Sequence, residues 1–232
     1  KREIRAYLHN VYGFLFAAVI LLLAGVLMLA FNFIYGTADM TFAMPELSYA
    51  LILMVPILCM RSMAEDKQNK TDLFYRSLPI PTWKVVLGKY LAILTVLAVP
   101  TLILCLYPLV LAIYGASNFG GAYAAILMFF LLAASLAAVC QFMSSLTDHL
   151  VVAAVLGVVA TLALFGLPFL ADALSASATV LSDVLNYVSP FYHYSTTLSW
   201  QMLGISSVLL PVSYAVLFVW LTTLSADRKH RG

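Results

Sequence analysis

All twelve lysine and arginine residues of this chain lie in three short segments, residues 1–5, 61–89 and 228–231, and the long apolar runs between them contain none. A cationic side chain inside hydrocarbon is costly, and positively charged loops stay in the cytoplasm during insertion. The chain is therefore predicted to cross a membrane several times, with these three segments in the cytoplasm. The remaining polar segments are expected outside, and they carry acidic residues only: Asp39, Glu46, Asp172 and Asp183.

The composition predicts one all-α membrane domain over residues 1–232. Hydrophobic residues make up 64% of the chain and charged residues 9%, which leaves too little polar surface to cover a water-soluble globule. The net charge of +2 is divided among three segments, so no nucleic-acid partner is expected. The three cysteines sit in apolar runs without metal-ligand spacing, and neither a metal site nor a cofactor bound by this chain is expected.

A span in helical form needs roughly 20 apolar residues. Five runs satisfy this length, and a sixth, residues 48–60, is shorter. Since the segments before and after residues 11–60 are both cytoplasmic, the chain crosses twice between them, and the short run is a span that continues as helix. The six predicted spans are residues 11–35, 46–64, 85–114, 122–146, 150–170 and 205–224. Both termini are then cytoplasmic.

Two polar features near the span ends carry local expectations. Asn32 and Gln141 are expected to form hydrogen bonds between helices, as polar side chains in membrane helices do. The inner turn at residues 147–149 is short enough for a tight helical hairpin, in which Thr147 or Asp148 caps the next helix.

The most informative polar segment is residues 65–83, between the second and third spans. Thr71 and Asp72 are suited to cap a short helix, which Pro79 ends. This helix would present Leu73, Phe74 and Leu78 among charged residues. A solvated loop is one interpretation, but exposed apolar side chains favour a docking ridge for a soluble partner. The side chains expected to anchor the neighbouring helices at the inner interface are Arg61, Trp83 and Lys89.

Residues 172–204 form a second distinctive segment, expected on the outer side. Apolar residues recur there at helical spacing opposite Ser and Asp, which predicts an amphipathic helix. Aromatic residues then alternate with Ser and Thr, as is typical of rings at the lipid headgroup level. Membrane anchoring is favoured over a substrate-stacking site for these residues, which are Tyr187, Phe191, Tyr192, Tyr194 and Trp200.

Several motifs in the same order resemble the permeases of ABC-2 type transporters, especially the gliding-motility-type branch. The strongest is MRSMAEDKQNKTDLFYRSLPIPTWKVVLGKYLA at residues 60–92, and further matches are KREIRAYL at the start, LYPLVLAIYG, SSLTDHLVVAAV and SPFYHY. The resemblance covers nearly the whole chain. It implies a six-transmembrane-helix fold of the type V exporter-like class, a coupling helix between spans 2 and 3, and a re-entrant or interfacial segment before span 6.

The same resemblance implies that the coupling helix docks on a cytoplasmic ATP-binding-cassette subunit. The residues assigned to this contact are Glu65, Asp66, Thr71, Asp72, Leu73, Phe74, Arg76, Ser77, Leu78 and Pro79. Relatives usually carry a run of leucines where this chain has Leu73 to Arg76, so the choice of partner can differ.

The chain lacks the G-x-x-x-x-G-K-[ST] phosphate loop, so ATP and Mg²⁺ are expected on the partner subunit, and no catalytic residue is assigned in this chain. The expected function is that of a permease in the bacterial cytoplasmic membrane, paired with a second copy or a related chain and surrounded by lipid. The apolar spans favour an amphiphilic, lipid-like or peptide cargo, and the resemblance implies export. The alternatives are a non-transporting scaffold of such a complex and, because intramembrane charges are missing, less readily a secondary transporter.

Overall fold

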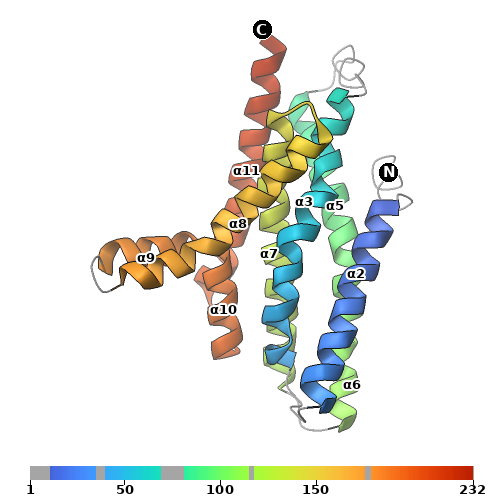
Figure 1. Cartoon of the computed structure of the whole chain (residues 1–232), viewed down its shortest axis with the longest axis vertical. Coiled ribbons are helices and arrows are strands. Elements are labelled where there is room, and N and C mark those ends of the chain that lie inside the picture. Colours follow the sequence, from blue (N-terminus) through green and yellow to red (C-terminus); the bar gives the residue numbers. More distant parts are fainter. Residues whose placement is uncertain (1–10, 35–39, 69–80, 115–117, 176–178, 232) are drawn as a thin grey trace.

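The computed structural model describes residues 11–34, 40–68, 81–114, 118–175 and 179–231. Within these ranges the chain forms helices and turns, with no strand (Figure 1). Six of the described helical stretches are long and apolar enough to cross a membrane: Gly13–Phe31, Met40–Gln68, Thr82–Ile113, Phe119–Leu146, Leu150–Leu174 and Ile205–Asp227. The predicted all-α class and the number of spans are thus confirmed.

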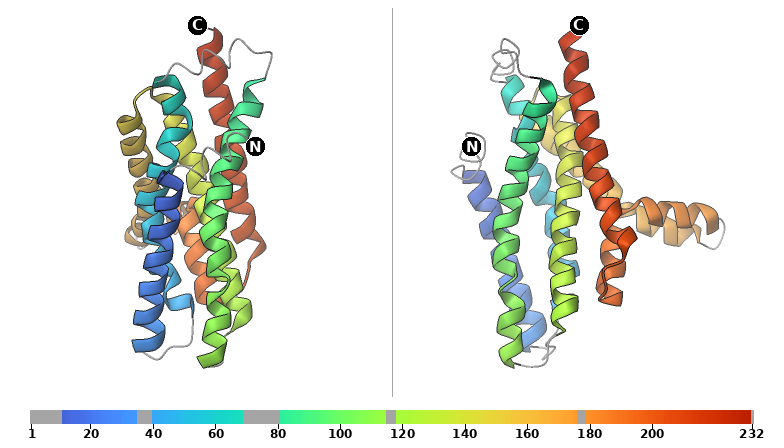
Figure 2. Two further views of the ribbon diagram at one scale, coloured as in Figure 1. Left: turned by 90° about the vertical axis from the view of Figure 1, so that its right-hand side faces the viewer. Right: turned by 180° about the vertical axis from the view of Figure 1, so that it is seen from behind.

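The long helices run alternately up and down one elongated bundle. They are α2 (Val11–Met28), α3 (Met44–Gln68), α5 (Thr82–Leu104), α7 (Phe119–Leu146), α8 (Leu150–Leu174) and α11 (Ile205–Arg231). Helices α3, α7 and α11 end at the upper end of the bundle in Figure 1, where α5 and α8 begin; the two views of Figure 2 show the same arrangement. We call this the basic end, because Arg61, Lys67 and Lys84 lie on the last turns of α3 and the first turn of α5.

Helix α5 and the short α6 (Tyr107–Tyr114) together form one span with a break at residues 105–106. Pro108 explains the break. It has no backbone N–H to donate to the carbonyl of Leu104, and its ring crowds that carbonyl. The chain therefore closes one turn with a bond from Leu106 N–H to Ile103 O (3.0 Å) and then resumes as α6.

Helix α7 is the centre of the bundle and contacts α3, α5, α8, α10 and α11. Its middle, residues 133–138, is buried and consists of small residues except for Leu136. Because lipid tails are as apolar as leucine, helices in a membrane associate mainly through close packing of small residues and hydrogen bonds. The small side chains of α7 allow five helices to approach it.

Helices α3 and α8 also cross closely, at Gly157. A Cβ atom built on this glycine would lie 3.0 Å from the Cβ of Pro56, so no larger residue fits without a shift of α3 or α8. One turn further along α8, Thr161 Oγ1 lies 3.0 Å from the carbonyl of Ile52 and 2.9 Å from that of Val158 on its own helix, so its hydroxyl hydrogen is shared between the two acceptors. Pro56 itself cannot donate to Ile52, and the threonine hydroxyl supplies a donor in its place.

Helix α9 (Thr179–Val188) extends sideways from the bundle, and the end of α8 leans out to meet it (Figures 1 and 2). Ser182 is buried and Asn186 Oδ1 is enclosed, whereas Val180, Leu181 and Val184 are exposed. The predicted outer segment thus contains an amphipathic helix, of which Ser182 and Asn186 face the protein, while Asp183 is exposed together with the apolar residues. Its apolar stripe faces away from the bundle.

Helix α10 (Pro190–Trp200) returns to the bundle and packs on α7 and α11. Ser189 caps it: its Oγ accepts from Tyr192 N–H (3.4 Å) and donates to the carbonyl of Leu164 (3.2 Å). Pro190 follows at the first helical position, where its missing N–H costs nothing. This cap joins the start of α10 to α8.

The chain reverses between α10 and α11 at Gln201, whose φ is 52°. A non-glycine residue adopts this left-handed conformation only where its surroundings hold it. In this reversal the side chain supplies the restraint, because Gln201 Oε1 accepts from Asn118 Nδ2 at 2.8 Å at the start of α7. The reversal is therefore joined to the end of the bundle opposite the basic end.

Candidate functional site

At the basic end, a buried lysine joins α5 to α3. Lys89 is only 3% exposed, and its Nζ donates to the carboxylate of Asp66 and to the carbonyl of Ser62. The sequence predicted Lys89 as an anchor at the membrane interface. It points into the bundle instead, because its neighbours Val86 and Tyr90 lie on the same buried face of α5. A cation in this position needs an acidic partner, which Asp66 provides.

A second lysine joins the end of α3 to the turn between α7 and α8. Lys67 Nζ donates to the carbonyl of Ser145 and, at 3.4 Å, to that of Thr147, and it lies 3.6 Å from a carboxylate oxygen of Asp148. We call Lys67, Lys89, Asp66 and Asp148, with the carbonyls that the lysines contact, the lysine clasp. It holds the last turns of α3 from two sides.

Hydroxyl and amide side chains of α7 extend this contact. Ser144 Oγ accepts from the N–H groups of Met63 (3.2 Å) and Ala64 (3.1 Å), and it donates to Met60 O at 3.2 Å. Gln141 Nε2 donates to Val86 O on α5 at 3.1 Å, which confirms the helix-to-helix hydrogen bond predicted for this residue. The ends of α3, α5 and α7 therefore form one connected polar unit inside an apolar bundle.

Of the predicted docking residues, the structure describes Glu65 and Asp66, which lie on the last turns of α3. Trp83, predicted as an anchor at the inner interface, lies on the first turn of α5 and is about half exposed. The other docking residues lie outside the described residues: Thr71, Asp72, Leu73, Phe74, Arg76, Ser77, Leu78 and Pro79. The clasp thus stands where the helices that flank residues 69–80 end and begin.

Sequence reasoning did not single out Lys67 and Ser144, and it gave Asp148 a different role. The turn at residues 147–149 is predicted to cap α8 through Thr147 or Asp148. In the structure His149 occupies the cap position without a side-chain bond, and Asp148 lies near Lys67 instead. A contact between residues so far apart in the chain leaves no periodic signal in the sequence.

The aromatic residues predicted at the lipid headgroup level divide into three groups. Tyr187 and Trp200 are exposed, as an interfacial ring would be, and Tyr192 is partly buried. Phe191 and Tyr194 differ from the prediction and belong to the core, because α10 packs this face against α3 and α8. Tyr194 donates its hydroxyl to Met44 O at 2.9 Å, and burial raises the pKa of this phenol above its ordinary value. The intervening His193 is also buried, with Nε2 3.1 Å from Tyr187 O.

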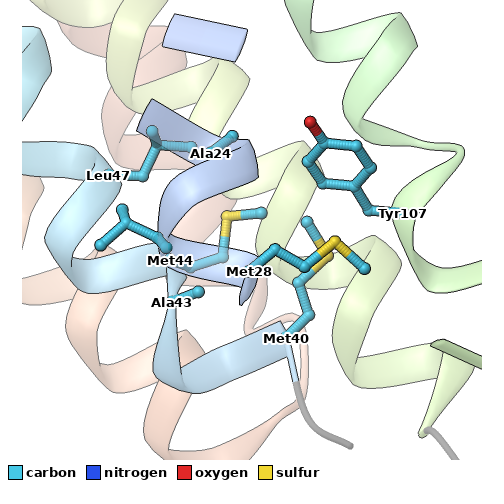
Figure 3. A pocket seen from close by; sticks show the side chains of 8 residues that line it. Ala24, Met28, Met40, Ala43, Met44, Leu47 and Tyr107 are labelled. Carbon is cyan, nitrogen blue, oxygen red and sulfur yellow. The ribbon is translucent and has the colours of Figure 1, made fainter. Parts of the chain in front are cut away.

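A small void between α2, α3 and α6 is lined by methionines (Figure 3). Met28, Met40 and Met44 surround it with Tyr107, and its volume of about 10 Å³ is at the lower limit for holding a single water molecule. Methionine is the residue that fills irregular gaps in a core. Among the described residues, no group of three His, Cys, Asp or Glu side chains is placed to hold a metal ion.

Comparison with known proteins gives one finding. A family model described as ABC-2 family transporter protein matches residues 31–226, which include every described helix from α3 to α10 and most of α11. A search of curated proteins found no match.

Proposed function

The chain belongs to the ABC-2 family of transporter proteins, and we propose that it is the membrane-spanning permease subunit of an ATP-binding-cassette exporter. A separate ATPase subunit hydrolyses ATP and docks at the basic end, on the segment that includes residues 71–78. The permease works as a pair, with a second copy or a related chain, in a bacterial cytoplasmic membrane. Its cargo is amphiphilic.

The observation that carries this proposal is the lysine clasp at the base of the docking segment. A force applied to residues 69–80 reaches the membrane through α3 and α5, the two helices that the segment connects. Lys89 with Asp66 joins these two helices, and Lys67 joins α3 to the α7–α8 turn. Because buried polar contacts have discrete partners, α3, α5 and α7 respond as one rigid body. This is the property that alternating access by rocking requires.

The positive charge of this end supports a cytoplasmic location. Lys and Arg are retained on the cytoplasmic side during insertion, and all described bases lie on the last turns of α3 and α11 or the first turns of α5. The proposed ATPase partner is a cytoplasmic protein, so its docking surface must lie at this end of the permease. The scaffold alternative predicts that the partner binds without a change in its ATPase rate, and the secondary-transporter alternative predicts no ATPase partner.

The test replaces residues 71–78 by a Gly/Ser linker of equal length. Since α3 and α5 keep their contacts, the permease is expected to insert and remain folded, but to lose co-purification with its ATPase and any effect on the ATPase rate. The control inserts eight Gly/Ser residues directly after Tyr114, where α6 ends, at the end of the bundle opposite the basic end. An unchanged ATPase response in the linker variant would contradict the proposal.

A further inference from the structure

A cleft opens between the first turns of α3, the second half of α8 and the buried face of α10. Its volume is about 240 Å³, and the elements that line it place it in the half of the bundle away from the basic end (Figure 1). The first turn of α3 contributes Pro45, Ser48 and Tyr49, while Tyr194 and Leu198 form part of the floor. A drug-sized ligand needs more room than this, so the volume suits the headgroup of an amphiphile.

Aromatic rings form the wall of this cleft. Phe165 is at the centre, with its ring centroid 5.4 Å from that of Tyr49, 5.2 Å from that of Phe169 and 5.3 Å from that of Phe191, all edge to face. Phe169 is 62% exposed, so part of the wall is open to a ligand. The faces of such rings carry partial negative charge and attract cations, and clusters of rings bind quaternary ammonium groups.

A carboxylate stands at the rim of the same cleft. Asp172 follows Phe169 by three residues on α8, which puts both on one face of the helix. Among the described residues no basic side chain pairs with this carboxylate, and every Lys and Arg of the chain lies in a segment predicted to be cytoplasmic, across the membrane from the cleft. The charge is thus available for a cation that does not come from this chain.

The hydroxyl groups that line the cleft on α3 and α10 are not available to bind an anion, because each already donates its hydrogen to a backbone carbonyl. Ser48 donates to Pro45 O (2.6 Å), Tyr194 to Met44 O (2.9 Å) and Ser195 to Tyr192 O (2.9 Å). An anionic headgroup needs N–H or O–H donors aimed at it. The cleft offers it a carboxylate and ring faces instead, which favour the opposite charge.

The geometry points to a binding site for the ammonium group of an alkylammonium amphiphile, with the nitrogen near Asp172 and Phe169 and the tail in the surrounding hydrocarbon. This inference deepens the proposed function by naming the class of cargo, and it rests on that function for the step from binding to export. Binding itself is a property of the permease alone.

The experiment measures binding of two probes with the same six-carbon tail, hexyltrimethylammonium and hexyl sulfate, to the full chain in a nonionic maltoside micelle by titration calorimetry. We expect the ammonium probe to bind at least about tenfold more tightly. Asp172→Asn should weaken ammonium binding about fivefold, since an ion pair at a partly exposed site has this magnitude. Phe169→Leu should weaken it about two- to fivefold through the lost ring face.

The matched control is Asp183→Asn, which removes another exposed carboxylate, on α9 and outside the cleft. It should leave the affinity unchanged. Equal affinity for the two probes, or equal effects of Asp172→Asn and Asp183→Asn, would overturn the inference. If the probe does not bind, but the 71–78 linker variant no longer affects the ATPase rate, the ammonium site is refuted and the proposed function is still supported.

A further arm identifies where the ammonium group comes from. Phosphatidylethanolamine is added to the micelles before the titration. A lower apparent affinity of the probe shows that the headgroup of a bilayer lipid occupies the site, and an unchanged affinity shows that the site selects a free amphiphile. Both results support an ammonium site and differ in its source.

Discussion

Removing Lys89 and removing Asp66 are expected to lower the free energy of unfolding by different amounts. The lysine side chain is 4% exposed and the aspartate side chain 26% exposed, so the two partners differ in how far they can return to water. Removing one partner of a fully buried ion pair costs roughly 3–5 kcal/mol, because the other charge is left uncompensated. The effect of each substitution therefore depends on which charge remains.

Asp66→Asn removes the negative charge beside the buried ammonium, which then has only neutral acceptors such as the carbonyl of Ser62. We expect a loss of about 3 kcal/mol in the free energy of unfolding, at the lower bound for a buried pair. Lys89→Met leaves the aspartate, which is a quarter exposed and can be hydrated, so the expected loss is only about 1–2 kcal/mol. The double variant Asp66→Asn with Lys89→Met removes both charges and should recover most of the loss.

The measurement is unfolding of the purified protein by SDS titration in mixed micelles, followed by circular dichroism, with all four proteins in one double-mutant cycle. Coupled partners give a cycle energy of roughly 0.5–3 kcal/mol. If the losses of the two single variants simply add in the double variant, Lys89 and Asp66 are not coupled. If Lys89→Met costs more than Asp66→Asn, the lysine is not the more deeply buried charge of the pair.

The close crossing of α3 and α8 yields two further predictions. Gly157→Ala should lower the free energy of unfolding by about 1–3 kcal/mol, because its Cβ would lie 3.0 Å from the rigid ring of Pro56; Gly166→Ala on the same helix meets nothing within 4 Å and should be neutral or slightly stabilising. Thr161→Val should cost about 0.6–1.7 kcal/mol through loss of the bond to Ile52 O; Thr223→Val, whose hydroxyl donates to Trp220 O on its own helix, should cost less. Both pairs are checked by the same SDS titration, and equal losses within a pair would contradict close packing of α3 on α8 at Gly157 and Thr161.

The number of spans and their alternation could be predicted because both depend on charge and apolar length alone. The positions of the lysines and arginines determine which segments share one end, and the described helices follow that assignment. The short run around residues 48–60 is identified as a span only by parity. In the structure α3 extends it at both ends, since Glu46 lies in the first turn and the polar residues to Gln68 continue the helix beyond the apolar part.

The clasp and the cleft could not be predicted from the sequence, since each depends on contacts between distant residues. Lys89 follows an ordinary apolar pattern on α5, and nothing local indicates that its partner is 23 residues earlier. The orientation of α9 was missed for a different reason. An amphipathic pattern predicts a helix with two faces, but it does not say which face meets the protein.

The exposed apolar residues of α9 have a consequence for how the protein is handled. Val180, Leu181 and Val184 are not covered by the bundle of their own chain, so lipid or detergent tails must cover this lateral helix. A small detergent micelle that covers only the helical bundle would leave the apolar side chains of α9 in contact with water. A lipid nanodisc offers a wider apolar layer, so the protein should stay monodisperse in nanodiscs under conditions in which it aggregates in small micelles.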